Sequence, residues 1–295
     1  MKKIFAITLS IAATAMMFQS CSEVEPAQDN GEMRFDVSLP QTRATDSAFE
    51  TGDKLSLWAV EYNGDTQMPL QIGGNFINNE KLTFDGTQWA AARTLYWSDN
   101  ACDFYALYPY SGEISSVESQ PFSIVADQNS AKSGDVLGGY EASDLMMASA
   151  VNASRSDGAV QLQFMHLMSK CRVNVIKGPK FEGDIPDDIT VHIYNTATDA
   201  VVNLTKCTLE KDPFSARKTI TMKKLDNQTF EAVVIPQNIE LRTPLIEVTM
   251  GGIAYLLEYS LSFKPAYCHT IDLTLNTSPD QEQIEISVDP SIQNW

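Results

Sequence analysis

The chain has 295 residues and a formal net charge of −17, with 38 acidic residues against 21 lysines and arginines. A surface this acidic repels a phosphate backbone, and the sequence has no long basic run, so we exclude nucleic acid as a partner. The chain is also longer than the roughly 100 residues that one β-sandwich needs.

Residues 1–20 have the features of a signal peptide. Lys2 and Lys3 precede an apolar run, Ile4–Phe18, that is too short for a bilayer span of roughly 20 residues. The run leads to Cys21, which fits a lipobox whose cysteine would receive acyl chains such as palmitate after cleavage. The alternative is an ordinary secretory signal with an incidental cysteine. Cleavage removes two lysines and changes the formal charge to −19.

Residues 21–32 are polar and acidic and form the expected lipidated tether. From Met33 onward apolar and polar residues alternate, which predicts half-buried strands. The runs that alternate most clearly are Met33–Leu39, Leu55–Val60, Phe104–Tyr108, Val160–Phe164, Cys171–Ile176, Ile189–Ile193, Phe230–Ile235, Ile246–Met250, Ile271–Leu275 and Ile284–Val288. No long stretch has helical periodicity, so we predict an all-β protein built from antiparallel β-sandwiches.

The length favours two sandwiches in series. We place the N-terminal β-sandwich at residues 33–155 and the C-terminal one, with a tail strand, at 156–295, because the polar segment 151–158 precedes a fresh strand. Segment 178–188, with two prolines, is the alternative joint.

The first strand and the segment after it form the most informative part of the sequence. The apolar residues of this strand are Met33, Phe35, Val37 and Leu39. Arg43 and Ala44 follow and form a candidate proteolytic site. A cut between them would remove the strand and leave an open edge and an empty apolar face, which invites a strand from another chain. The alternative is that Arg43 is an exposed linker residue and the strand stays in place.

Catalytic and metal-binding motifs are absent from the sequence. The three histidines, His166, His192 and His269, lie within strand patterns, and no metalloprotease, serine-hydrolase or phosphate-loop motif occurs. Asp135, Glu141 and Asp144 do not have the spacing of a calcium loop. We therefore predict that the protein is not an enzyme and has no cofactor and no metal site.

Two further groups of residues leave alternatives open. The four cysteines of the mature chain have no metal-ligand spacing and are either buried thiols or members of one or two disulfides: Cys102, Cys171, Cys207 and Cys268. Aromatic residues are concentrated in the first half and either fill the core or are exposed and stack on glycans: Trp58, Tyr62, Trp89, Tyr96, Trp97, Tyr105, Tyr108 and Tyr110.

Several short motifs, in this order and spacing, resemble those of fimbrillin-like lipoproteins, which build or tip the type V pili of anaerobic bacteria. They are Cys21, Thr-Arg-Ala-Thr at 42–45, Phe49 with Gly52 and Asp53, Tyr96 with Trp97, DFYALYPY at 103–110, DQ at 127–128, DLMMA at 144–148 and LQFMHLMSKCRVNV at 162–175. In the last motif His166 is expected to be structural.

The resemblance implies two tandem transthyretin-like β-sandwiches, export as a lipoprotein to the cell outer membrane, cleavage at Arg43 and assembly by donor-strand exchange into a fimbrium. It implies other pilus subunits as partners, as well as a host or bacterial surface receptor or glycan. In this reading Met33–Leu39 is the displaced strand. The tail residues Ile284, Ile286 and Val288 are the candidate donor strand, and stalk and tip roles both remain open. The alternative function is a surface glycan-binding lipoprotein.

Overall fold

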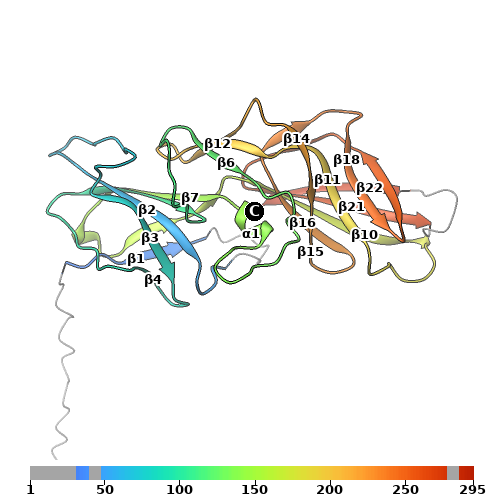
Figure 1. Ribbon diagram of the computed structural model, residues 1–295, viewed down its shortest axis with the longest axis horizontal. Helices are drawn as coiled ribbons and strands as arrows, with labels where there is room; N and C mark the ends of the chain where they lie inside the picture. Colours follow the sequence, from blue (N-terminus) through green and yellow to red (C-terminus); the bar gives the residue numbers. More distant parts are fainter. Residues whose placement is uncertain (1–30, 40–47, 278–285) are drawn as a thin grey trace, which may run out of the picture. The chain divides into compact units, whose positions relative to one another are not determined.

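The computed structural model describes residues 31–39, 48–277 and 286–295, and Gly31–Trp295 form one compact unit. Strands dominate this unit (Figure 1), in agreement with the predicted all-β class. The described helical segments are α1 (Gly139–Ser143) and a 3₁₀ turn at Arg155–Asp157. None of the described helices has the length and apolar character needed to cross a bilayer.

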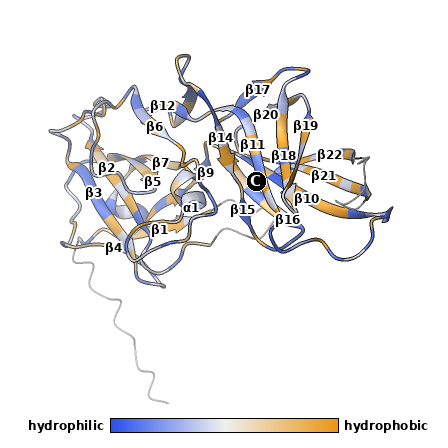
Figure 2. Cartoon of the chain, turned by 45° about the vertical axis from the view of Figure 1, so that its right-hand side comes forward, coloured by the Kyte–Doolittle hydropathy of each residue, from blue (hydrophilic) through white to orange (hydrophobic). Residues whose placement is uncertain are grey.

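The largest sheet has six strands in the order β4-β3-β2-β5-β7-β9. Their bounds are β2 (Lys54–Glu61), β3 (Ile77–Phe84), β4 (Trp89–Ala91), β5 (Cys102–Tyr108), β7 (Met146–Ala153) and β9 (Met165–His166). All neighbours in this sheet pair antiparallel. In Figure 2 β2 carries both hydrophobic and hydrophilic colours, whereas β3 is largely hydrophilic because Asn78–Lys81 are consecutive polar residues.

A parallel pair, β1 (Phe35–Ser38) with β8 (Val160–Gln163), covers one face of the six-stranded sheet. The side chains between them form a cluster that we call the first core. Its members include Leu55, Leu57, Leu82, Trp89, Phe104, Tyr108, Met146, Leu162 and Phe164. Apolar residues of β1 and of the six-stranded sheet therefore share one buried interior.

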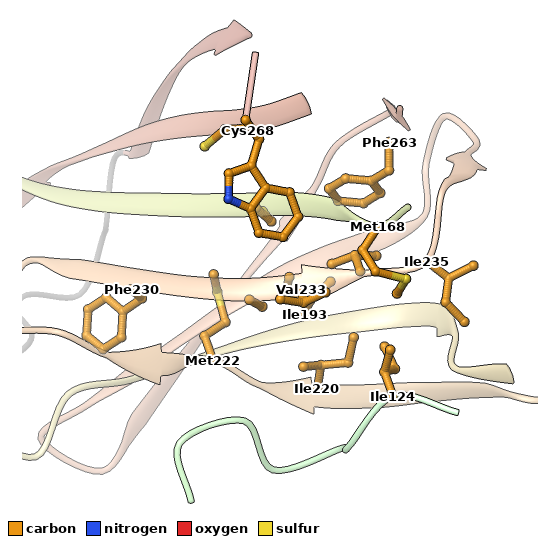
Figure 3. Packing of buried hydrophobic residues seen from close by; sticks show 14 of the residues in the cluster. Ile124, Met168, Ile193, Ile220, Met222, Phe230, Val233, Ile235, Phe263 and Cys268 are labelled. Carbon is orange, nitrogen blue, oxygen red and sulfur yellow. The ribbon is translucent and has the colours of Figure 1, made fainter. Parts of the chain in front are cut away.

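Two further sheets enclose the second core. One has the order β15-β16-β10-β21-β22 and the other β14-β11-β18-β19. Their bounds are β10 (Ser169–Lys180), β11 (Thr190–Ala197), β14 (Arg217–Thr221), β15 (Lys223–Lys224), β16 (Thr229–Val234), β18 (Pro244–Met250), β19 (Ile253–Glu258), β21 (Tyr267–Thr277) and β22 (Ile286–Asn294). Figure 3 shows part of this core, with Ile193, Ile220, Met222, Phe230, Val233 and Phe263 among its residues.

The two halves of the chain are tied together by strands and side chains. In the sheet β13-β12-β6, β6 (Gln120–Ser123) pairs with β12 (Asp199–Asn203), and β13 (Thr208–Lys211) lies outside β12. The Gln128 side chain donates to the Val233 carbonyl and accepts from its N–H, both at 2.7 Å. The second core also includes Trp58 and Tyr105 of the six-stranded sheet. A small sheet of β17 (Gln237–Ile239) and β20 (Leu261–Phe263) completes the unit.

The division into two domains at residue 155 stays a prediction. The structure adds that β8 and β9, which follow residue 155, pair with β1 and β7, which precede it. A boundary read from turn-rich composition cannot detect such pairings, because they join residues far apart in the sequence.

The predicted strands are present, but β2 and β5 are buried on both faces instead of half-buried, because one face of each contributes to the first core and the other to the second. The tail differs in extent. The tail strand continues to Asn294 instead of ending at Val288, although it contains Pro290. Proline lacks an N–H, and an edge strand tolerates this loss because one of its two sides has no strand partner.

Candidate functional site

Strand β1 is held by backbone hydrogen bonds along one edge. The Val160 N–H donates to the Arg34 carbonyl at 2.8 Å, and the Phe164 N–H donates to the Ser38 carbonyl at 2.9 Å. On the opposite side the Met33 N–H donates to the Leu95 carbonyl at 2.8 Å. From Phe35 to Ser38, β8 is the one strand in the described part of the chain that pairs with β1. Backbone hydrogen bonds to one strand, β8, therefore keep β1 in place, and the bond from Met33 to Leu95 holds the residues that precede it.

The apolar side chains of β1 face the first core. Met33 is buried, and Phe35, Val37 and Leu39 are half-buried against the same cluster. The Phe35 ring meets the Phe104 ring edge-on, with 6.3 Å between centroids. Because Phe35 is in register with Val160 and Val37 with Leu162, the apolar residues of β1 and β8 lie on one face. The residues predicted for the displaced strand are thus brought together on one surface.

A groove of about 570 Å³ lies beside β1 on the side away from β8. It is lined by residues 32–35 and by residues 88–95, which include β4. The guanidinium of Arg93, at its wall, donates to the Glu80 carboxylate at 2.8 Å. The groove borders the edge of β1 that lacks a strand partner.

Four residues of the predicted sites lie outside the described residues: Cys21, Arg43, Ala44 and Ile284. Lipidation and proteolytic processing therefore stay predictions. The other two tail residues, Ile286 and Val288, lie in β22, where they are in register with Leu275 and Leu273 of β21.

Strand β22 is an edge strand with little side-chain burial. It pairs antiparallel with β21 from Ile286 to Asn294. Val288 is half-buried and packs against the second core, whereas residues 289–294 are exposed. Ile292, an apolar residue, has 49% of its surface exposed. Backbone pairing contributes most of the contact along the strand itself.

The residue after β22, Trp295, is buried with 4% exposure and fixes the end of the strand. Its ring stacks on His166 with 3.9 Å between centroids and 12° between planes. The Lys170 ammonium lies 5.8 Å from the centre of the Trp295 ring. The backbone N–H of Trp295 donates to the Ala266 carbonyl at 2.9 Å. We call this group of contacts the Trp295 anchor.

Buried charges support the Trp295 anchor. His166 Nδ1 lies 2.8 Å from an oxygen of Asp144. Lys170 forms an ion pair of 3.0 Å with Glu231, which also accepts from Arg172 Nε at 2.7 Å. Lys170 and Glu231 are almost fully buried. A buried charge is costly unless it is paired, so these contacts are expected to fix the positions of His166 and Lys170.

The sequence profile of the fimbrillin-like family matches residues 42–295. The chain belongs to the fimbrillin-like family. This confirms the family that the sequence motifs indicated.

Solved structures share the fold of this fimbrillin-like protein. A Bacteroides uniformis protein whose suggested role is cell adhesion is 21% identical, with a TM-score of 0.67 over 90% of this chain and 100% of that one. A Bacteroides ovatus protein with the same suggested role is 14% identical, with a TM-score of 0.66 over 90% of this chain and 96% of that one. No curated protein matches the sequence significantly.

The four cysteines within the described part of this fimbrillin-like chain are free thiols, with Cys102, Cys171 and Cys268 buried and Cys207 half-buried. Burial raises the pKa of the Cys102 thiol to about 11. Cys171 is in register with His269, and Cys268 with Lys170, so the two cysteines face opposite sides of their sheet. This register does not favour a disulfide between them.

Half of the eight aromatic residues considered for glycan stacking are buried in the cores. Trp58, Trp89, Tyr105 and Tyr108 are buried. Tyr96 is the most exposed of the set, at 55%. The aromatic side chains of the first half thus offer little stacking surface.

The acidic residues considered for calcium are separated into individual pairs. Asp135 bonds to Lys54 at 2.8 Å, Glu141 to Lys223, and Asp144 to His166. The described ranges contain no group of three or more side chains suited to hold a metal ion.

The Trp295 anchor is the feature of this fimbrillin-like chain that the sequence did not reveal. His166 lies within a motif that the sequence singled out, and Lys170 follows four residues later. The only local signal for Trp295 is a large apolar residue at the end of a polar tail. Its contacts come from β9 and β10, about 125 residues earlier in the chain.

Proposed function

We propose that this protein is a structural and adhesive subunit, stalk or tip, of a cell-surface pilus. In this proposal it is exported as a lipoprotein through Cys21, reaches the outer membrane, and assembles by donor-strand exchange after cleavage between Arg43 and Ala44. Membership of the fimbrillin-like family supports the pilus role. We also propose that its sheets form two tandem transthyretin-like sandwiches.

The observation that carries the proposal is the placement of β1. It is a four-residue strand with one strand partner in the described structure, its apolar side chains face the first core, and the chain that follows it contains Arg43. Loss of β1 would leave the edge of β8 unpaired and uncover Leu162 and Phe164. An unpaired edge beside an apolar face is a strong acceptor for another strand.

The tail has the pattern that such an acceptor requires. Apolar residues occupy alternate positions from Ile284 to Ile292, as they do from Met33 to Leu39: Ile284, Ile286, Val288, Pro290 and Ile292. At roughly 3.3 Å per residue, the nine residues of β22 reach about 30 Å, which exceeds the length of β1. The exposed Ile292 shows that the fold of the single chain does not bury this whole apolar face. We therefore propose β22 as the donor to the next subunit.

The first test is the N-terminal sequence and mass of protein recovered from the cell surface. A start at Ala44 without acyl mass is expected for an assembled subunit. A start at acylated Cys21 with β1 still present would contradict cleavage and favour a glycan-binding lipoprotein or an anchor.

A second test examines strand exchange directly. Protein nicked after Arg43 is incubated with a labelled peptide of residues 283–294, and we expect uptake of the peptide and loss of the β1 fragment. A peptide with Val288→Asp is the matched control, because its charge would face the apolar acceptor. Arg43→Ala protein, which resists the nick, should take up neither the parent peptide nor the Val288→Asp peptide. If the nicked chain stays monomeric and retains the β1 fragment, strand exchange is wrong.

A further inference from the structure

A pocket of about 700 Å³ lies away from both edge strands. Its walls come from β2, β3, β5, β6 and β12 and from the loop 132–137. Pockets of 300–1,000 Å³ with mostly apolar walls and a few polar groups are typical of small-molecule sites. The volume therefore suits a compact ligand better than a strand.

The inner wall of the pocket is apolar. Leu107, Leu145 and Val202 line it and are buried, and Phe122 is half-buried beside them. Val136, at 70% exposure, contributes an apolar residue from the loop. Contact with these side chains would remove the apolar body of a ligand from water, which is favourable.

The same pocket contains three lysines, in a chain whose formal charge is −17. The Lys54 ammonium bonds to Asp135 at 2.8 Å, and that of Lys132 lies 4.0 Å from Glu50. The Lys81 ammonium instead lies 5.5 Å from the centre of the Tyr110 ring and has no ion pair within the described structure. Lys81 therefore offers a positive charge next to an apolar surface.

We propose that this pocket binds an amphipathic organic anion, a molecule with an apolar body and one carboxylate or sulfonate group. The apolar body contacts Leu107, Phe122 and Leu145, and the anionic group bonds to the Lys81 ammonium. Lys54 and Lys132 are each paired with a carboxylate, that of Asp135 and that of Glu50, so Lys81 supplies the unpaired positive charge among the described residues of the pocket. This site is independent of the proposed strand exchange.

The probe for the test is 8-anilinonaphthalene-1-sulfonate, an aromatic sulfonate whose fluorescence reports contact with apolar surface. We expect one molecule bound per chain, displaced by dodecanoate. Lys81→Gln should weaken binding about tenfold, because a hydrogen bond to a charged group is lost. Lys81→Arg should restore binding to within about threefold. Lys211→Gln, on the exposed strand β13, is the matched control and should leave binding unchanged.

A second variant tests the apolar wall without risk to the fold. Val136→Ser changes an exposed side chain and should weaken probe binding severalfold. Near-UV circular dichroism must be the same for each variant and the parent chain. The proposal is overturned if no probe binds, if Lys81→Gln binds as tightly as the parent, or if the neutral N-phenyl-1-naphthylamine binds as tightly as the sulfonate. Displacement by glucuronate and not by dodecanoate would also overturn it, in favour of an acidic sugar.

Discussion

Strands β1 and β22 are both edge strands, yet they are held in different ways. The segment Met33–Leu39, which contains β1, packs its apolar side chains in or against the first core along its whole length. β22 exposes its side chains from Asp289 to Asn294, and a single buried residue, Trp295, fixes its end. β1 is held by its apolar side chains as well as by backbone pairing with β8, whereas β22 is held by backbone pairing with β21, by Val288 and by Trp295 at its end. This difference bears on the proposal that β1 is removed by proteolysis and that β22 is released intact.

The largest expected effect comes from a charge on the buried face of β1. Phe35→Asp should lower the free energy of unfolding by on the order of 4 kcal/mol, because a carboxylate would face the first core without a partner. Urea denaturation measures the change. Ser38→Asp places the same charge on the exposed face and should cost less than about 0.5 kcal/mol. Equal losses for the two variants would show that β1 is not held by its apolar face.

The next effect concerns the Trp295 anchor. Trp295→Ala should lower the free energy of unfolding by about 3 kcal/mol, through loss of the stack on His166 and the contact with Lys170. Faster hydrogen exchange along β22 than along β10 would locate the change. Ile292→Ala, at an exposed position of the same strand, is the control and should cost about 0.5 kcal/mol or less. Unchanged exchange along β22 in the Trp295 variant would contradict an anchored end.

A smaller effect is the response of the β21–β22 pair to pH. His269, in register with Ile292, accepts a hydrogen bond from the Lys264 N–H at Nε2, at 3.1 Å. Burial and then the nearby Lys264 charge lower the pKa of His269. The unfolded chain thus binds a proton more readily, so stability should fall as the pH drops through about 6.5 toward the folded value. His269→Gln should flatten this dependence between pH 7 and pH 5.5, and an unchanged slope would contradict it.

The smallest effect concerns labelling rates alone and compares a cysteine paired with β22 with a cysteine of the first core. Cys268 is in register with Gln293 of β22, and Cys102 lies in the first core. Both thiols are buried and have raised pKa values, so maleimide should react slowly with each. Trp295→Ala should accelerate labelling of Cys268 and leave that of Cys102 unchanged. Equal acceleration at both cysteines would indicate global unfolding instead of release of β22.

Local alternation was sufficient to predict most strands of the cores. Leu55–Val60, Phe104–Tyr108 and Ile246–Met250 all lie within observed strands. The alternation did not predict β3, because Asn78, Asn79 and Glu80 interrupt its apolar pattern. β12 and β6 gave no clear signal either, because they form a small sheet that joins the two halves of the chain.

The all-β class, the family and the apolar face of the first strand could be predicted from the sequence, because local alternation and short motifs carry each of them. Only the tertiary structure decided that β8 pairs with β1, that Trp295 stacks on His166, and that three lysines share one pocket. Those arrangements depend on strand order and register, which long-range pairing sets and local propensity does not. The physical reason is that alternation defines two faces of a strand but does not identify its neighbours.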